Sequence, residues 1–143
     1  EDRWFERMIE RPPEEHPYAI EVQEPGSPET WVHVGSAGLF GFDWRSRSAE
    51  FGIMIGDKSY WNRGYGAEVT RLILRHGFET FNLHRIYLRV FATNPRARRA
   101  YEKAGYKLEG TLRQDEYRGG AYIDVQVMSV LRPEYTAKIE NRE

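Results

Sequence analysis

Two glycines in alternate positions, Gly64 and Gly66, mark the part of this sequence that is best suited to binding chemistry. They follow an apolar run at residues 51–55 and stand directly before a helical pattern of apolar residues. Glycine allows backbone conformations that a side chain would forbid, so the amide N–H groups of such a loop can point outward together. With the positive end of the helix dipole, these amides would suit a phosphate or pyrophosphate.

The loop matches neither of the familiar phosphate-binding motifs. A P-loop continues with Gly-Lys-Ser/Thr, and the dinucleotide fingerprint needs a third glycine and a later ribose-binding acid. This sequence has neither arrangement around residue 64. Glycines before a helix also occur in ordinary turns, so a structural turn and a phosphate cradle both stay open at this point.

Composition narrows the class of protein. The 143 residues are 40% hydrophobic and 30% charged, which suits one soluble domain with a proper core. With a net charge of −1, the chain has no overall positive charge that would attract nucleic acid or a membrane surface, so we expect neither as a partner. The absence of cysteine excludes disulfides, thiolate metal ligands and a cysteine nucleophile. The four histidines lack the spacing of metal ligands, so we expect no metal.

No targeting or membrane signal is visible in the sequence. No apolar run approaches the ~20 residues of a membrane span, and no signal peptide is recognisable, so we expect a cytoplasmic protein. Residues 4–9 carry an apolar stripe at helical spacing that Pro12-Pro13 would end. Because the chain begins without Met and already in a helical pattern, we expect it to be part of a longer protein.

Hydrophobic periodicity predicts one α+β domain over residues 1–135, followed by a polar tail at 136–143. Alternating residues predict a meander of three antiparallel strands, then one further strand and a closing hairpin. Asn94-Pro95 opens a second helix and Gly105 ends it. The order implies a mixed, mostly antiparallel sheet with helices on both faces. The predicted strands are 18–23, 31–42, 49–55, 85–91, 106–117 and 122–131, and the predicted helices are 66–81 and 94–104.

Two motifs about 30 residues apart give the sequence a family resemblance. They are Arg63-Gly64-Tyr65-Gly66-Ala67 and Asn94-Pro95-Arg96-Ala97-Arg98-Arg99-Ala100-Tyr101-Glu102-Lys103-Ala104-Gly105-Tyr106. Together they resemble the GNAT superfamily of acyl-CoA N-acyltransferases. Ala49-Glu50-Phe51 and the hairpin at 117–125 look like the branch that acetylates ribosomal-protein N-termini, and spermidine N-acetyltransferases are similar over the same stretches. The resemblance covers roughly residues 4–135 and lacks the first strand and helix of the family, which help to wall the acceptor site.

The resemblance implies a site for acetyl-CoA as cosubstrate. The pyrophosphate would lie on the loop amides and the pantetheine along the strand that ends at Ile55. The family splays this strand from the next one, and an amide near Met54 would donate to the thioester oxygen as negative charge develops there. The implied cofactor-binding residues are Met54, Ile55, Gly56, Arg63, Gly64, Tyr65, Gly66, Ala67, Asn94, Arg99 and Tyr101.

Several of these residues also have a purely structural interpretation. Asn94 would cap the second helix, as well as or instead of contacting the pantetheine. Arg96, Arg98 and Arg99 would contact the phosphates or adenine, or form a solvated helix face. Tyr101 lies where the family often places a tyrosine beside the CoA sulfur, so the resemblance implies a general acid for the departing thiolate. The alternative for Tyr101 is packing on the sheet.

Glu50 is the carboxylate best placed to serve as the general base. An acceptor amine must be neutral to attack, and its pKa is ~10.4 for a lysine-like amine and ~8 for an α-amine. Period-two alternation puts Glu50 on the same strand face as the small Gly52, which leaves room for a ligand or water. The alternative is an ion pair of Glu50 with Arg45 or Arg47. Three weaker candidates for the base are Asp43, Glu116 and Asp124.

The leading functional prediction is an N-acetyltransferase that moves an acetyl group from acetyl-CoA directly to a primary amine in a ternary complex. The absence of cysteine favours this over a thiol-bound acyl intermediate. The acceptor would be a protein N-terminus, a small polyamine or an aminoglycoside-type antibiotic. The alternative from another class is a CoA-binding sensor or interaction module without catalysis. For the assembly, the expectation is a homodimer.

Overall fold

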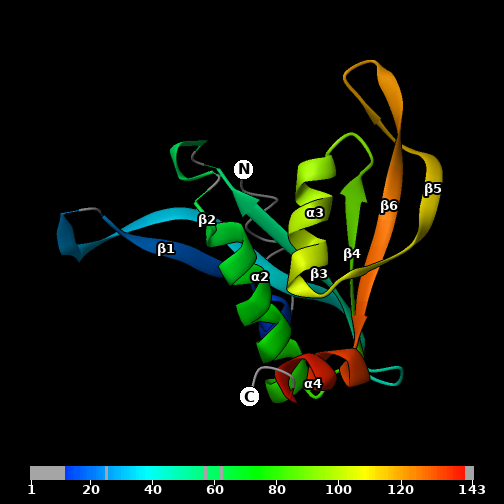
Figure 1. The fold of residues 1–143 in the computed structure, drawn as a ribbon, viewed down its shortest axis with the longest axis horizontal. Coiled ribbons are helices and arrows are strands. Elements are labelled where there is room, and N and C mark those ends of the chain that lie inside the picture. Colours follow the sequence, from blue (N-terminus) through cyan, green and yellow to red (C-terminus); the bar gives the residue numbers. More distant parts are fainter. Residues whose placement is uncertain (1–11, 25, 57, 62, 141–143) are drawn as a thin grey trace.

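The computed structural model describes residues 12–24, 26–56, 58–61 and 63–140, and these residues form one six-stranded sheet. The strand order is β1-β2-β3-β4-β6-β5 (Figure 1). Only β3 and β4 pair in parallel; the other four neighbouring pairs are antiparallel. The strands are β1 (Tyr18–Glu24), β2 (Ser27–Asp43), β3 (Ser48–Ile55), β4 (Arg85–Phe91), β5 (Lys107–Arg118) and β6 (Ala121–Leu131). The α+β class and the mostly antiparallel sheet predicted from the sequence are therefore confirmed.

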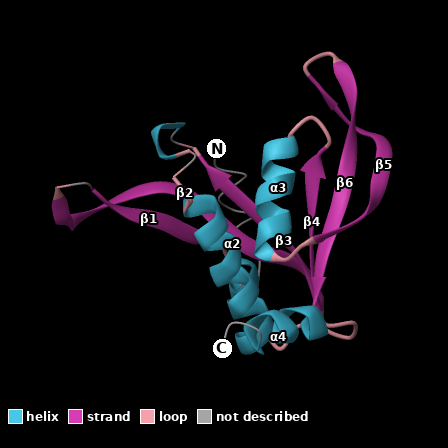
Figure 2. Cartoon of the chain, viewed as in Figure 1, coloured by secondary structure: helices cyan, strands magenta, loops and turns pink. Residues whose placement is uncertain are grey.

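The two longest helices lie together on one face of the sheet (Figure 2). Leu39 of β2 is buried on this side, beneath the turn at Gly77. Its neighbour Gly38 faces the other way, toward Pro17 at the end of the short helix η1, so η1 covers part of the opposite face. The helical elements are η1 (Pro13–Glu15), η2 (Lys58–Tyr60), α2 (Tyr65–Arg75), η3 (His76–Thr80), α3 (Pro95–Ala104) and α4 (Arg132–Glu140).

Three predictions differ from the structure by more than a one-residue shift of an element's end. The helix predicted at 66–81 changes from α to π geometry at His76, where the Phe81 amide donates to the His76 carbonyl oxygen. The first hairpin extends further than predicted, so β2 begins at Ser27. Residues 136–140 belong to α4 rather than to a polar tail, because Tyr135 stacks on Phe78 and fixes the helix to the core. The predicted helix at 4–9 and residues 141–143 lie outside the described residues.

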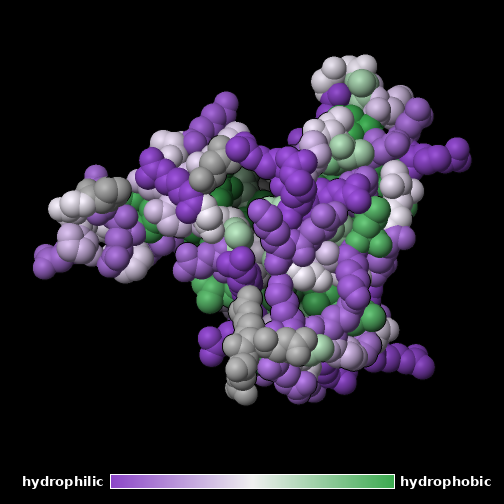
Figure 3. Space-filling model, viewed as in Figure 1, coloured by the Kyte–Doolittle hydropathy of each residue, from purple (hydrophilic) through white to green (hydrophobic). Residues whose placement is uncertain are grey.

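The core fills the space between the sheet and the α2–α3 layer. The side chains of Ile86, Met128 and Leu83 have no exposed surface, and Phe78 retains 1%. They come from β4, β6, the loop before β4 and η3, so the core joins elements from the whole second half of the chain. The surface in the view of Figure 3 is mostly hydrophilic, with small hydrophobic patches between the polar residues.

Arg132 holds the irregular end of the α2–η3 segment. Its guanidinium donates to the carbonyl oxygens of Leu83 (2.9 Å) and Phe78 (2.5 Å) and to the side-chain oxygen of Asn82 (2.9 Å). A helix end leaves carbonyl groups without intrahelical donors, and buried carbonyls without partners are costly. One half-buried arginine from the start of α4 thus provides hydrogen-bond donors for the acceptor oxygens of the segment that connects α2 to β4.

We expect Arg132→Met to lower the free energy of unfolding by about 2–3 kcal/mol, because methionine keeps the aliphatic length but leaves these acceptors without a charged donor. Chemical denaturation monitored by circular dichroism measures the change. Arg113→Met, at an exposed position of β5, is the matched control and should change stability little. Equal stability of the two variants would contradict a structural role for Arg132.

Candidate active site

The central feature of the site is a fork between β3 and β4. The two strands pair in parallel only at Ser48–Arg85, Ala49–Ile86 and Glu50–Tyr87. Beyond Glu50, β3 runs on to Ile55 and β4 to Phe91 without further pairing between them, and Figure 1 shows the strands diverging. The splay that the family resemblance implied is therefore confirmed. It leaves the β4-facing backbone edge of β3 without a strand partner from residue 51 onward.

A cavity of about 480 Å³ opens between β3, α2 and α3. Its apolar floor includes the side chains of Ile53 and Ile55, and its walls come from the two helices and the loop before α2. The remaining lining residues are Tyr60, Trp61, Gly64, Gly66, Ala67, Thr70, Asn94, Arg96, Ala97, Ala100 and Tyr101. The glycine loop and the second motif, which lie about 30 residues apart in sequence, therefore form opposite walls of the same cavity.

The first turn of α2 presents unpaired amides at the cavity. Gly64 caps the helix in the left-handed conformation with φ +81°, which glycine adopts without strain. The first intrahelical bond runs from the Glu68 amide to the Gly64 carbonyl oxygen (3.1 Å). The preceding amides at 64–67 have no partner within the described part of the chain, and no side chain there caps this helix end. A Cβ added to Gly66 would meet only Ile55 Cδ1, at 4.0 Å, so the space over this turn is open.

The predicted loop residues divide into two groups. Gly64, Gly66 and Ala67 line the cavity. Arg63 and Tyr65 do not: the Arg63 guanidinium lies 5.3 Å from the centre of the Tyr60 ring, and the Tyr65 ring packs beside the same ring at 6.2 Å. Arg63 and Tyr65 could therefore contribute their backbone amides to an anion site, whereas their side chains pack around Tyr60.

The residues predicted at the end of β3 do not all face the cavity. Ile55 lines the cavity, but the Met54 side chain is 67% exposed and faces the opposite side of the sheet. The Gly56 amide donates to the Val34 carbonyl oxygen (2.9 Å), so its N–H is already engaged with β2, and a part for the Gly56 backbone in cofactor binding stays a prediction. A Cβ at Gly35 would lie 2.0 Å from the Met54 carbonyl oxygen, so glycine is required where β2 approaches β3 this closely.

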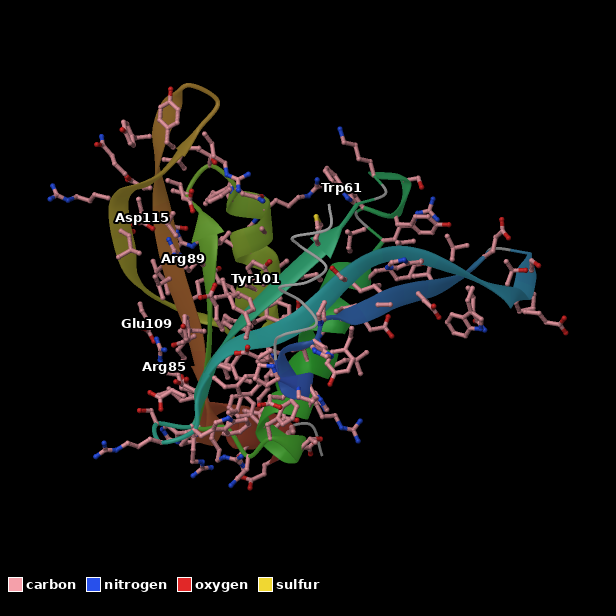
Figure 4. The ribbon with its side chains drawn as sticks, turned by 180° about the vertical axis from the view of Figure 1, so that it is seen from behind. Trp61, Arg85, Arg89, Tyr101, Glu109 and Asp115 are labelled. Carbon is pink, nitrogen blue, oxygen red and sulfur yellow. The ribbon has the colours of Figure 1, made fainter. Side chains whose placement is uncertain are left out.

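Trp61 is a site residue whose role sequence reasoning missed. Its indole N–H donates to the Ile55 carbonyl oxygen (2.8 Å) while its ring lines the cavity (Figure 4). It therefore ties the loop before α2 to the end of β3. The sequence signal was the tryptophan itself, an uncommon large residue in a polar loop, but its partner is a backbone group that no sequence pattern identifies.

The start of α3 brings Asn94 and Arg96 to the cavity. The Asn94 side-chain oxygen accepts a hydrogen bond from the Ala97 amide (3.1 Å), so its predicted capping role is confirmed. Arg96 lines the cavity, whereas the predicted Arg99 is exposed and lies outside the lining. Arg98 pairs with Glu102 one turn along (2.9 Å). Arg96 is thus the arginine of this helix that is placed to meet an anion in the cavity.

Tyr101 lies at the inner wall, packed edge-on against the rings of Phe51 (6.3 Å between centres) and Tyr106 (5.9 Å). Its hydroxyl has no hydrogen-bond partner among the described residues. Burial raises the pKa of the Tyr101 hydroxyl, so the group stays protonated at neutral pH. The residue both packs on the sheet and presents a protonated phenol to the cavity, so the two sequence interpretations are compatible.

Glu50 lies on the face opposite the cavity, beside Tyr87 of β4. Burial raises the pKa of its carboxyl group, and the positive charge of Arg89 and a hydrogen bond from Tyr87 partly offset this. The predicted alternative of an ion pair with Arg45 or Arg47 is not found in the described structure. Arg47 instead donates to the Asn82 carbonyl oxygen (2.7 Å).

Two of the three weaker candidates for the base have structural roles. Asp43 accepts hydrogen bonds from the amides of Arg45 (3.1 Å) and Ser46 (3.0 Å), which fixes the turn between β2 and β3. Asp124 accepts one from the Gln114 amide (2.7 Å) at the irregularity of β5. Of the described carboxylates, Glu50 is the one in the last β3–β4 pair before the strands separate, and its role as the base, like that of the alternative Glu116, stays a prediction.

In the part of the chain that the structure describes, no group of three or more His, Asp or Glu side chains could hold a metal ion. Among the same residues, no helix has the length and apolar character needed to cross a membrane.

Comparisons with known proteins agree with this geometry. A family model described as an acetyltransferase (GNAT) domain matches residues 1–107. Spermidine N(1)-acetyltransferase of Vibrio cholerae is 34% identical over 107 residues, which cover 75% of this chain and 61% of that protein. The chain thus spans about three fifths of this curated relative and 49% of its Escherichia coli counterpart.

Solved structures of the Vibrio cholerae spermidine N-acetyltransferase have the same fold. A structure in complex with CoA and spermine superposes with a TM-score of 0.80 at 28% identity, covering 94% of this chain and 75% of that one. A dodecameric structure of that enzyme gives the same TM-score and identity, with coverage of 94% and 74%. The fork, the amide-lined helix start and the match to the family model together show that the chain belongs to the GNAT acetyltransferase family.

Proposed function

We propose that this protein is an N-acetyltransferase that transfers the acetyl group of acetyl-CoA to a primary amine of the polyamine class. The observation that carries the proposal is the cavity at the fork, which has free amides at one wall and a protonated phenol at the other. A polyamine acceptor is supported by the Vibrio cholerae relative, whose structure contains CoA and spermine. Protein N-termini and aminoglycosides are alternative acceptors.

The cavity walls suggest how CoA would be held. The amides at 64–67 and the positive end of the α2 dipole would bind the pyrophosphate, with Arg96 facing it from α3. The unpaired edge of β3 would accept the pantetheine, which carries amide groups able to continue a strand-like hydrogen-bond pattern. The β3 amide near Met54 would stabilise the negative charge on the thioester oxygen in the transition state.

The chemistry needs two proton movements, and the two predicted catalytic residues lie on opposite faces of the fork. The amine nitrogen attacks the thioester carbon, a C–N bond forms, and the C–S bond breaks. Tyr101 would give its phenolic proton to the departing thiolate, and Glu50 would take the proton lost by the amine. We propose direct transfer within a ternary complex; the absence of cysteine favours this over a thiol-bound acyl intermediate.

The assembly is proposed to be oligomeric, with a homodimer as its minimal form. This is supported by the dodecameric structure of the Vibrio cholerae relative.

The proposed function predicts acetylation of spermidine and spermine in preference to N-terminal peptides and aminoglycosides. Release of CoA and mass-spectrometric detection of the acetylated amine measure turnover in one panel. Faster turnover of peptides would reassign the acceptor class. CoA binding with no acetylated product from any amine would support the non-catalytic CoA-binding module instead.

Gly66→Val should weaken CoA binding by roughly tenfold or more, or ~1.4 kcal/mol, because two methyl groups would occupy the open space over the free amides. Isothermal calorimetry with CoA measures the change. Gly110→Val is the matched control, since it makes the same substitution in an open strand position that is not part of the cavity lining. Unchanged CoA affinity in a folded Gly66→Val protein would rule out this anion site.

Tyr101→Phe should lower kcat by ~10²–10⁴-fold while CoA affinity changes little, because the ring and its packing remain but the proton donor is lost. Steady-state kinetics and calorimetry on the same preparation separate the two effects. Tyr106→Phe is the control, since this neighbouring hydroxyl is buried outside the cavity lining and has no hydrogen-bond partner in the described structure. Wild-type turnover in Tyr101→Phe would leave Tyr101 with a packing role only.

A further inference from the structure

Tyr87 occupies a special position relative to Glu50. The two residues are the last pair in register before β3 and β4 separate. Side chains of directly paired residues project to the same face of a sheet, so the Tyr87 side chain stands beside the Glu50 carboxyl group on the side away from the cavity. Burial raises the pKa of both groups; beyond that, the Tyr87 hydroxyl lowers the pKa of the Glu50 carboxyl group and Glu50 raises that of Tyr87, so the two side chains interact. Tyr87 is thus the neighbour of Glu50 at the base of the fork.

Two arginines flank Tyr87 along β4. Arg85 and Arg89 lie two residues before and after it, on the same face, and the Arg85 guanidinium is 4.7 Å from the centre of the Tyr87 ring. Arg85 pairs with Glu109 of β5 (2.9 Å), and Arg89 pairs with Asp115 of the same strand. Figure 4 shows these two pairs side by side across the back of the sheet.

The contacts of Arg85 and Glu109 extend to β6, so three strands hold this group of side chains in place. Ser129 is 4% exposed, and its hydroxyl donates to the second carboxylate oxygen of Glu109. Glu109 therefore accepts from β4 and β6 at once, and it fixes the arginine that packs on the Tyr87 ring. A side chain held in this way presents its hydroxyl in one place, which is what a positioning group requires.

Among the residues that the structure describes, the charged groups around Glu50 can be assigned element by element. From β4, Tyr87 and Arg89 act on the carboxyl group, and from β5, Asp115 stands behind Arg89 as its counter-ion. From β2, the paired residue is the uncharged Phe40. Beyond β2, the Glu15 carboxylate of η1 is bound by the amides of Gly41 and Phe42.

We propose that Tyr87 is a positioning residue for the acetyl transfer, and that its hydroxyl fixes the Glu50 carboxylate at the base of the fork so that it can take the proton of the acceptor amine. The inference rests on the proposed function and adds to it a residue outside the cavity. Tyr87 itself exchanges no proton: Glu50 takes the amine proton, and Tyr101 protonates the thiolate. The positive charge of Arg89 lowers the pKa of Glu50 and so opposes the effect of burial.

The direct test measures the ionisation of Glu50 without any turnover. In protein labelled with ¹³C-glutamate, carboxyl resonances are followed as a function of pH, and the Glu50 signal is the one lost in Glu50→Gln. Tyr87→Phe keeps the ring over which Arg85 lies but removes the hydroxyl, so the pKa of Glu50 should rise relative to wild type. Tyr122→Phe, at the exposed tip of the β5–β6 hairpin, is the control and should not change it.

The kinetic test uses the shape of the pH profile. Glu50 acts as a base only when ionised, so a higher pKa in Tyr87→Phe should move the acid limb of kcat/KM to higher pH. We expect a loss of about tenfold on the acid side that shrinks as pH rises. A purely structural role for Tyr87 would instead lower kcat/KM by the same factor at every pH.

The two arginines provide a matched pair of variants. Both lie on β4, face the same side and pair with a β5 carboxylate, but only Arg89 acts electrostatically on Glu50. Arg89→Gln should therefore raise the pKa of Glu50, as Tyr87→Phe does, and Arg85→Gln should leave it close to the wild-type value. Equal shifts in the two arginine variants would show a general loss of structure instead.

The outcomes separate this inference from the proposed function. An unchanged Glu50 titration and an unchanged acid limb in folded Tyr87→Phe would overturn the inference while leaving the acetyltransferase intact. An acid limb that persists in Glu50→Gln would also overturn it, because Glu50 would then not be the base. If wild-type protein binds CoA but acetylates no amine, the proposed function fails, and the carboxyl titration still decides whether Tyr87 controls Glu50.

Discussion

The structure depends on one interrupted strand pairing. A backbone edge that leaves its neighbour must find other hydrogen-bond partners, and at this fork a ligand can supply them. The interruption is imposed from both sides, since β3 stays paired with β2 as far as Ile55 and β4 stays paired with β6 as far as Phe91. The close approach that Gly35 permits holds the end of β3 to β2. The fork therefore follows from how β3 and β4 pair with their outer neighbours in the sheet.

The alternation of side chains along β3 assigns a different task to each face of the fork. Ile53 and Ile55 point into the cavity, while Glu50 and Met54 point to the opposite side. In a continuous sheet the backbone would separate these two environments. Where the strands diverge, groups on one face can reach a substrate that lies on the other. This is how the proposed acid Tyr101 and the proposed base Glu50 would serve one reaction centre from opposite faces of the sheet.

The sequence predicted the elements well because their patterns are local. β4 was predicted at its observed bounds, since strict alternation over seven residues has few other interpretations. Which arginine of α3 lines the cavity was harder to predict. It is Arg96 and not Arg99, and the difference is set by how the helix docks on the sheet. Trp61 and Arg89 act through partners 6 and 26 residues away, and contacts of this kind follow from the tertiary fold rather than from any local pattern.

One physical cause, removal of water, sets both proposed catalytic groups in their required states. Burial raises the pKa of the Tyr101 hydroxyl and of the Glu50 carboxyl group alike. For the phenol, this moves ionisation further from neutral pH, so the group remains a proton donor. For the carboxylate, it moves ionisation toward neutral pH and makes the anion a stronger base. The positive charge of Arg89 and the interaction with Tyr87 act against burial on the pKa of Glu50, so the proposed base is set by the balance of these effects.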